Sequence, residues 1–149
     1  NTGKARAMGF ELESQFRVAD GWKGHANYSY QDLKWSQAGA GTLSPRHKVN
    51  FGVQTDGNSR MEAAMMFHFV GSSQITSNGN PFLVNSYLRA DSRLSYNFGS
   101  KKLPMALSFI VINLLDDKHM EYPVTTQPGD PVQSVPQRRT MYIGLRGQL

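Results

Sequence analysis

The sequence predicts an all-β protein, built as an antiparallel up-and-down meander of about seven strands. Apolar and polar residues alternate along most segments, which is the pattern of a strand with one apolar and one polar face. No long window shows the i, i+3, i+4, i+7 apolar spacing of an amphipathic helix. The connections are alternately short and long, as in a meander with tight turns at one end and loops at the other.

The first two strands lie on either side of the expected tight turn at 19–21. In the first strand, apolar residues alternate with polar residues that include Glu11, Glu13 and Arg17. The second strand begins at Trp22 and alternates aromatic or small residues with polar ones. Each segment therefore sorts its side chains onto two faces of a strand, whereas a helix would mix them.

Five further segments follow with the same period, although with different regularity. They are 48–54, 60–70, 87–98, 103–113 and 140–149. The clearest is 87–98, where Arg89, Asp91 and Arg93 share one face. The least regular is 103–113, because Ile110 and Ile112 fall on its otherwise small or polar face. We expect all five to be strands.

The lengths of the connections between strands indicate whether each face of the sheet meets lipid or water. The short ones are 19–21, 56–58 and 99–102, and the long ones are 36–45, 72–85 and 116–136. Outer-membrane barrels have short periplasmic turns, longer extracellular loops and apolar-out, polar-in strands. The polar face then lines a wet lumen, and its expected lumen-facing residues are Glu11, Glu13, Arg17, Arg89, Asp91, Arg93 and Arg146. The alternative is a soluble β-barrel or sandwich that binds a small molecule, in which the apolar face is a closed core.

Composition excludes several classes of protein and site. The chain has 149 residues, no cysteine and a net charge of +5, so disulfides and cysteine-based metal sites are impossible. Its four histidines show no metal-ligand spacing, and no catalytic constellation can be assembled. The basic residues are spread over every strand, on the face opposite the aromatic residues, which argues against nucleic-acid binding. We therefore expect no enzyme activity, no cofactor, no metal site and no nucleic-acid partner.

Five short motifs occur in an order that is specific when they are taken together. They are NTGKARAMGFELE at 1–13, DGW followed by ANYSY at 20–30, SPRHK at 44–48, VINLLDDK at 111–118 and RTMYIGLR at 139–146. This ordered set resembles the C-terminal barrel strands of TonB-dependent outer-membrane receptors. The sequence departs from the family pattern in two places. Leu149 stands where the family usually has Phe or Trp, and His119 and Met120 replace the usual aromatic residue.

The resemblance implies that residues 1–149 are the C-terminal segment of a bacterial outer-membrane barrel of roughly 22 strands. The plug domain and the earlier strands would precede Asn1. The implied function is TonB-dependent uptake of a scarce ligand, such as an iron–siderophore complex, with this chain forming barrel wall and extracellular loops. The implied partners are the rest of the barrel and its plug, the TonB energy-coupling complex, outer-membrane lipid and lipopolysaccharide, and a small-molecule or metal-complex ligand. A passive outer-membrane pore without a plug is a further alternative.

The longest loop supplies the candidate ligand-binding residues. It is expected on the extracellular side, where a receptor would meet its ligand, and it combines a histidine with acidic, thioether and aromatic side chains. These candidates are His119, Met120, Glu121 and Tyr122.

Overall fold

The computed structural model describes residues 4–35, 44–57, 60–77, 80–100, 102–119 and 136–147. The strands, in chain order, are β1 (Ala5–Ala19), β2 (Trp22–Trp35), β3 (His47–Thr55), β4 (Met61–Val70), β5 (Ser73–Ser77), β6 (Asn80–Val84), β7 (Tyr87–Ser100), β8 (Leu103–Ile112) and β9 (Thr140–Gly147). No helix occurs in these ranges, so none of them holds a helix long and apolar enough to cross a membrane.

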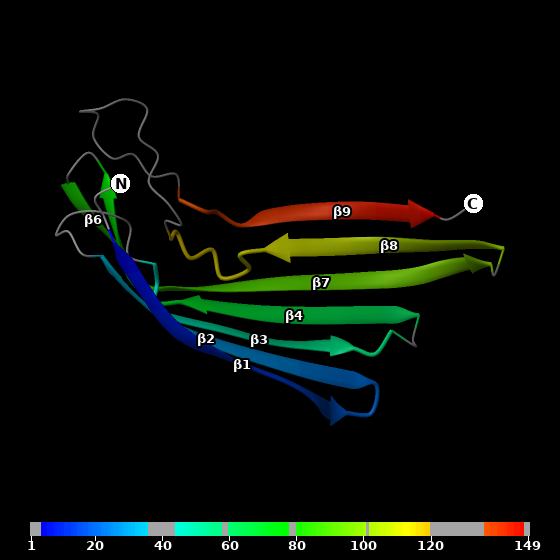
Figure 1. Ribbon diagram of the computed structural model, residues 1–149. Coiled ribbons are helices and arrows are strands. Elements are labelled where there is room, and N and C mark those ends of the chain that lie inside the picture. The colour runs from blue at the N-terminus through cyan, green and yellow to red at the C-terminus, as the bar shows by residue number, and fades with distance from the viewer. Residues whose placement is uncertain are drawn as a thin grey trace.

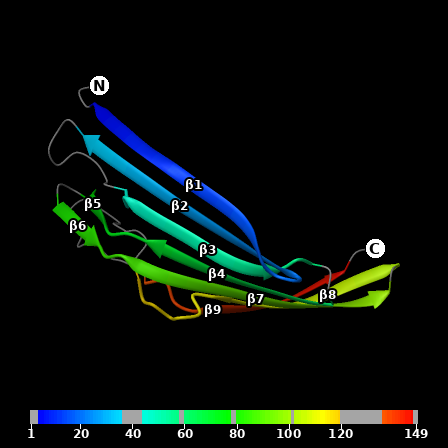
Figure 2. The same cartoon turned by 90° about the horizontal axis from the view of Figure 1, so that it is seen from below.

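Seven of the strands form one antiparallel sheet in the order β1-β2-β3-β4-β7-β8-β9. Figures 1 and 2 show it as a single twisted layer, with β1 and β9 as its open edges. The predicted all-β meander is confirmed. The segment 72–85 connects β4 to β7 as predicted, but it also contains a hairpin of β5 and β6 that was not predicted. Strand-favouring residues such as Ile75 and Phe82 explain this difference.

The strand ends joined by the tight turns lie at one end of the sheet, together with the end of β9, and the strand ends that flank the long connections lie at the other (Figure 1). We call these the turn end and the loop end. Gly21 and Gly57 have φ angles of 76° and 81°, which residues with a side chain rarely adopt. The alternation of short and long connections predicted from the sequence is therefore present.

The strand register carries the polar face from β1 to β7. One row of directly opposed residues runs Glu13, Asn27, Asn50, His68 and Arg89 across β1, β2, β3, β4 and β7. Directly opposed residues project to the same side of a sheet. The sheet therefore has a continuous polar face.

The other face is apolar and uncovered. The rings of Phe51 and Phe67 lie side by side, with centroids 6.4 Å apart. Many large apolar side chains on this face are exposed, from 36% at Val49 to 78% at Ile143. A soluble sandwich would bury these residues against a second layer, and the described residues form no such layer. The architecture therefore favours a wall whose apolar side meets lipid.

Candidate functional site

The register places all seven residues predicted to face the lumen on the polar face. They are Glu11, Glu13 and Arg17 on β1, Arg89, Asp91 and Arg93 on β7, and Arg146 on β9. Because they come from three strands of one layer, they form an extended polar surface and not a compact cluster.

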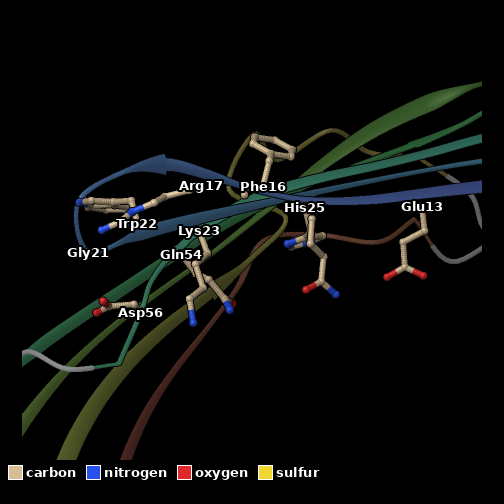
Figure 3. A pocket seen from close by; sticks show the side chains of 11 residues that line it. Glu13, Phe16, Arg17, Gly21, Trp22, Lys23, His25, Gln54 and Asp56 are labelled. Carbon is tan, nitrogen blue, oxygen red and sulfur yellow. The ribbon is translucent and has the colours of Figure 1, made fainter.

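Close to the turn end, the polar face is hollowed by about 590 Å³. Figure 3 shows Glu13 and His25 projecting to one side of the sheet and Phe16 to the other. Lys23 and Arg17 add positive charge to the same hollow. This mixture of opposite charges suits water or a polar protein surface as the neighbour. Among the residues that the structure describes, no group of three or more histidine, aspartate and glutamate side chains is placed to hold a metal ion.

Asp91 is the centre of a polar network on the middle strands. Its Oδ2 atom lies 3.2 Å from Nη2 of Arg89 and 3.4 Å from Nε2 of His68. The Nδ1 atom of His68 lies 2.8 Å from Oδ1 of Asn50, whose Nδ2 donates to Oδ1 of Asn27 over 3.4 Å. Only 22% of the Asp91 side chain is exposed, so its charge interactions are screened less than at a free surface. We call these five residues the polar network; it ties β2, β3, β4 and β7 together.

Arg93 points to different partners from those of Arg89. Its Nε donates to Oγ of Ser95 over 3.0 Å, and this oxygen lies 2.8 Å from Oγ of Ser108 on β8. Ser95 is only 1% exposed, so this contact satisfies a buried hydroxyl. The polar face is thus fastened to β8 by side chains as well as by the backbone.

At the loop end, Asn113 joins the two sides of the longest connection. Its backbone N–H donates to Oδ1 of Asp91 over 3.0 Å. Its Nδ2 donates to the carbonyl oxygens of Asp117 and Gln137, over 3.0 and 3.2 Å. The N–H of Gln137 donates in turn to the carbonyl oxygen of His119 over 3.0 Å. We call residues 113–119 and 136–139 the loop stem.

A carboxylate closes the outer part of the loop stem. Oδ1 of Asp116 accepts the backbone N–H of Arg139 over 3.0 Å. This hydrogen bond is the largest cause that lowers the pKa of the Asp116 carboxyl. Partial desolvation acts in the opposite direction, and the positive charges of Arg139, Lys118 and Arg138 lower the pKa further. Because the folded-state pKa is depressed, the contact is present above the ordinary carboxyl pKa and is lost only as the pH falls through the lowered value.

His119 lies inside the loop stem. It is 6% exposed, and its ring stacks on that of Tyr87 with centroids 3.8 Å apart and an angle of 12°. Its Nδ1 donates to the carbonyl oxygen of Asp117 over 2.9 Å. Through these contacts His119 stabilises the loop stem. Its contact with a ligand stays a prediction. The other three candidates, Met120, Glu121 and Tyr122, lie outside the described residues.

Replacing Asn113 by alanine is expected to open the loop stem. The change removes two side-chain hydrogen bonds and places alanine at a φ of 55°, which together cost about 2–3 kcal/mol. Hydrogen exchange of the Gln137 and Arg139 amides in the full-length protein should accelerate by roughly 30- to 160-fold. Asn113→Gly is the control: glycine adopts the same φ without strain and loses the same two side-chain hydrogen bonds, so its effect should be smaller by the backbone strain alone. Unchanged exchange in Asn113→Ala would contradict the assigned role.

Sequence reasoning missed Asn50, His68 and Asn113 as members of the site. His68 and Asn50 meet Asp91 only through the strand register, which the alternating pattern does not specify. Asn113 had a local signal, because it directly follows a strand and asparagine is enriched at positive φ.

Comparison with known proteins supports this architecture. A family described as TonB dependent receptor-like, beta-barrel matches residues 1–114. No curated protein matches the chain. The ferric citrate transporter FecA, in its unliganded form, matches with a TM-score of 0.80 and 19% identity over 98% of this chain and 25% of that one.

Two further structures are similar. The open form of the ferric-catecholate import receptor Fiu from E. coli K12 has a TM-score of 0.72 and 18% identity, covering 95% of this chain and 20% of that one. FpvA of P. aeruginosa, bound to a heterologous pyoverdine and iron, has a TM-score of 0.71 and 17% identity, with 97% and 20% covered. At these identities the likeness shows the fold. The chain spans a quarter or less of each of these structures.

Proposed function

Because the chain belongs to the family of TonB-dependent receptor-like β-barrels, we propose that it forms the C-terminal wall of a bacterial outer-membrane receptor. The receptor takes up a scarce ligand, such as an iron–siderophore complex, by TonB-dependent transport. The observation that carries the proposal is the family match over residues 1–114, joined to a sheet with one polar and one uncovered apolar face. An apolar-out, polar-in wall is what an outer-membrane barrel requires.

The two faces have different partners in this proposal. The apolar face meets outer-membrane lipid and lipopolysaccharide. The polar face lines the lumen, where its charged surface meets water and the plug domain, and TonB acts through that plug. The rest of the barrel pairs with the open edges of β1 and β9, because unpaired strand edges are prone to aggregation.

The loop end forms part of the extracellular surface that captures the ligand. His119, Met120, Glu121 and Tyr122 are the proposed contacts, and the loop stem holds the first of them in place through Tyr87 and Asp117. The chain contributes binding and a wall and no catalytic group, in keeping with the transport proteins and receptors that it resembles.

Iron uptake by cells that produce the full-length protein tests the proposal. Ferric citrate, a ferric catecholate and a ferric pyoverdine, each labelled with radioactive iron, are offered separately to a strain lacking its own receptors for them. We expect accumulation of at least one complex, and its loss in the same strain without TonB. Uptake that persists without TonB would indicate the passive pore instead. Absence of the protein from the outer-membrane fraction would overturn the proposal.

A further inference from the structure

Three basic residues gather on the apolar face at the loop end, where an uncharged surface would otherwise be expected. Arg6 on β1 is directly opposed to Lys34 on β2, and the pair Met8 and Asp32 lies next to them on the same face. Arg46 joins them through its side chain, which forms an ion pair with Asp32. We call Arg6, Asp32, Lys34 and Arg46 the basic rim.

Contacts with Asp32 hold two of the three cations of the basic rim close together. Oδ1 of Asp32 lies 3.1 Å from Nη2 of Arg46, and its Oδ2 lies 3.5 Å from Nζ of Lys34. Nη2 of Arg6 lies 3.4 Å from the sulfur of Met8, on the apolar face. The side chains of Lys34 and Arg46 are 72% and 63% exposed. The rim therefore presents three positive charges against one largely covered carboxylate.

An aromatic cluster fixes the depth of the basic rim. The ring of Phe10 lies 5.7 Å from the rings of both Tyr28 and Tyr30, and the Oη atom of Tyr28 lies 2.9 Å from Nδ1 of His47. Tyrosine rings favour the membrane–water interface. Arg6 is four residues beyond Phe10, about 14 Å along an extended strand. The rim thus lies at the depth of lipid headgroups when this face meets a membrane.

We propose that the basic rim binds the phosphate groups of a phosphorylated glycolipid of the outer leaflet, whose acyl chains run down the apolar face. Guanidinium groups match phosphate oxygens in a bidentate geometry, and lysine adds a point charge. The apolar side chains directly below, Phe10 and Leu12, offer a surface for acyl chains, and this favours a lipid over free phosphate. The inference rests on the proposed placement of this face in the outer membrane.

Binding to nanodiscs tests this site. The full-length protein is reconstituted in phosphatidylcholine nanodiscs and titrated with bisphosphorylated lipid A, and bound lipid is counted by native mass spectrometry. The variant Arg6→Gln/Lys34→Gln/Arg46→Gln should bind roughly 100-fold more weakly, about fivefold for each basic residue. The control Lys23→Gln/Arg60→Gln/Lys102→Gln removes the same charge at the turn end and should change binding less than twofold.

Control ligands and a single variant show whether binding depends on the phosphate groups of the lipid. Dephosphorylated lipid A should bind weakly, and inorganic phosphate at millimolar concentration should not displace the phosphorylated lipid. Equal binding of both lipids, displacement by phosphate, or unchanged affinity in the rim variant would each overturn the inference. If the triple variant fails to assemble, Lys34→Gln alone should still weaken binding about fivefold. Iron uptake and outer-membrane location of the unmodified protein are measured in parallel, so failure of the proposed function is recognised separately.

Discussion

Replacing Phe67 by arginine is expected to prevent stable insertion of the full-length protein into the outer membrane. Phe67 lies on the apolar face in the middle of β4, opposed to Phe51 on β3 and to Ala90 on β7. An arginine on the lipid face near the bilayer midplane costs about 2–4 kcal/mol, a large part of the stability of an ordinary domain. The folded fraction in outer membranes, measured by its altered migration on unheated gels, should fall by at least tenfold.

Two control variants separate the effect of charge from that of lost packing. Phe67→Leu keeps the site apolar and should insert nearly as well as the unmodified protein. Gln15→Arg adds the same charge to an exposed position of the polar face, opposed to His25, and should be tolerated. Normal insertion of Phe67→Arg would mean that this face does not meet lipid, and the proposed membrane placement would then be wrong.

Period-two alternation was sufficient to predict the strands of the sheet, because the alternation within each strand shows which of its residues share a face. The strand phase also holds in the irregular segment 103–113. Ile110 is opposed to Arg93 and Ile112 to Thr140. Both isoleucines therefore lie on the polar face, where their position in the alternation places them. The hairpin of β5 and β6 was missed because its Gly-, Ser- and Asn-rich composition outweighed its few strand-favouring residues.

The contacts within the candidate site were harder to predict from the sequence, because they depend on the register between strands. Asp91 was recognised as part of a charged face, but its partner His68 is distant in the chain and belongs to another strand. The residues that make up the basic rim could not be identified from the sequence for a similar reason, since Arg6 and Lys34 become neighbours only when β1 and β2 pair. Contacts between strands require the pairing of specific residues, and alternation alone specifies only the face.

Replacing Asp91 by alanine is expected to destabilise both the wall and the loop stem. The change leaves the 29%-exposed side chain of Arg89 without this carboxylate and removes the acceptor of the Asn113 N–H. Breaking a partly buried ion pair on one side, with loss of this hydrogen bond, costs about 3 kcal/mol. The free energy of unfolding of the full-length protein in urea, measured in detergent micelles, should fall by this amount. Exchange of the Gln137 amide should accelerate as well.

The variant Asp91→Asn shows whether one side chain connects the two regions. An amide oxygen can still accept the Asn113 N–H, but it carries no charge for Arg89. We therefore expect a loss of about 1–2 kcal/mol in unfolding free energy, with exchange at Gln137 close to that of the unmodified protein. If Asp91→Ala lowered stability and left exchange at Gln137 unchanged, the polar network and the loop stem would be independent. If the two variants accelerated exchange equally, the charge of Asp91 and not its hydrogen bond to Asn113 would hold the stem.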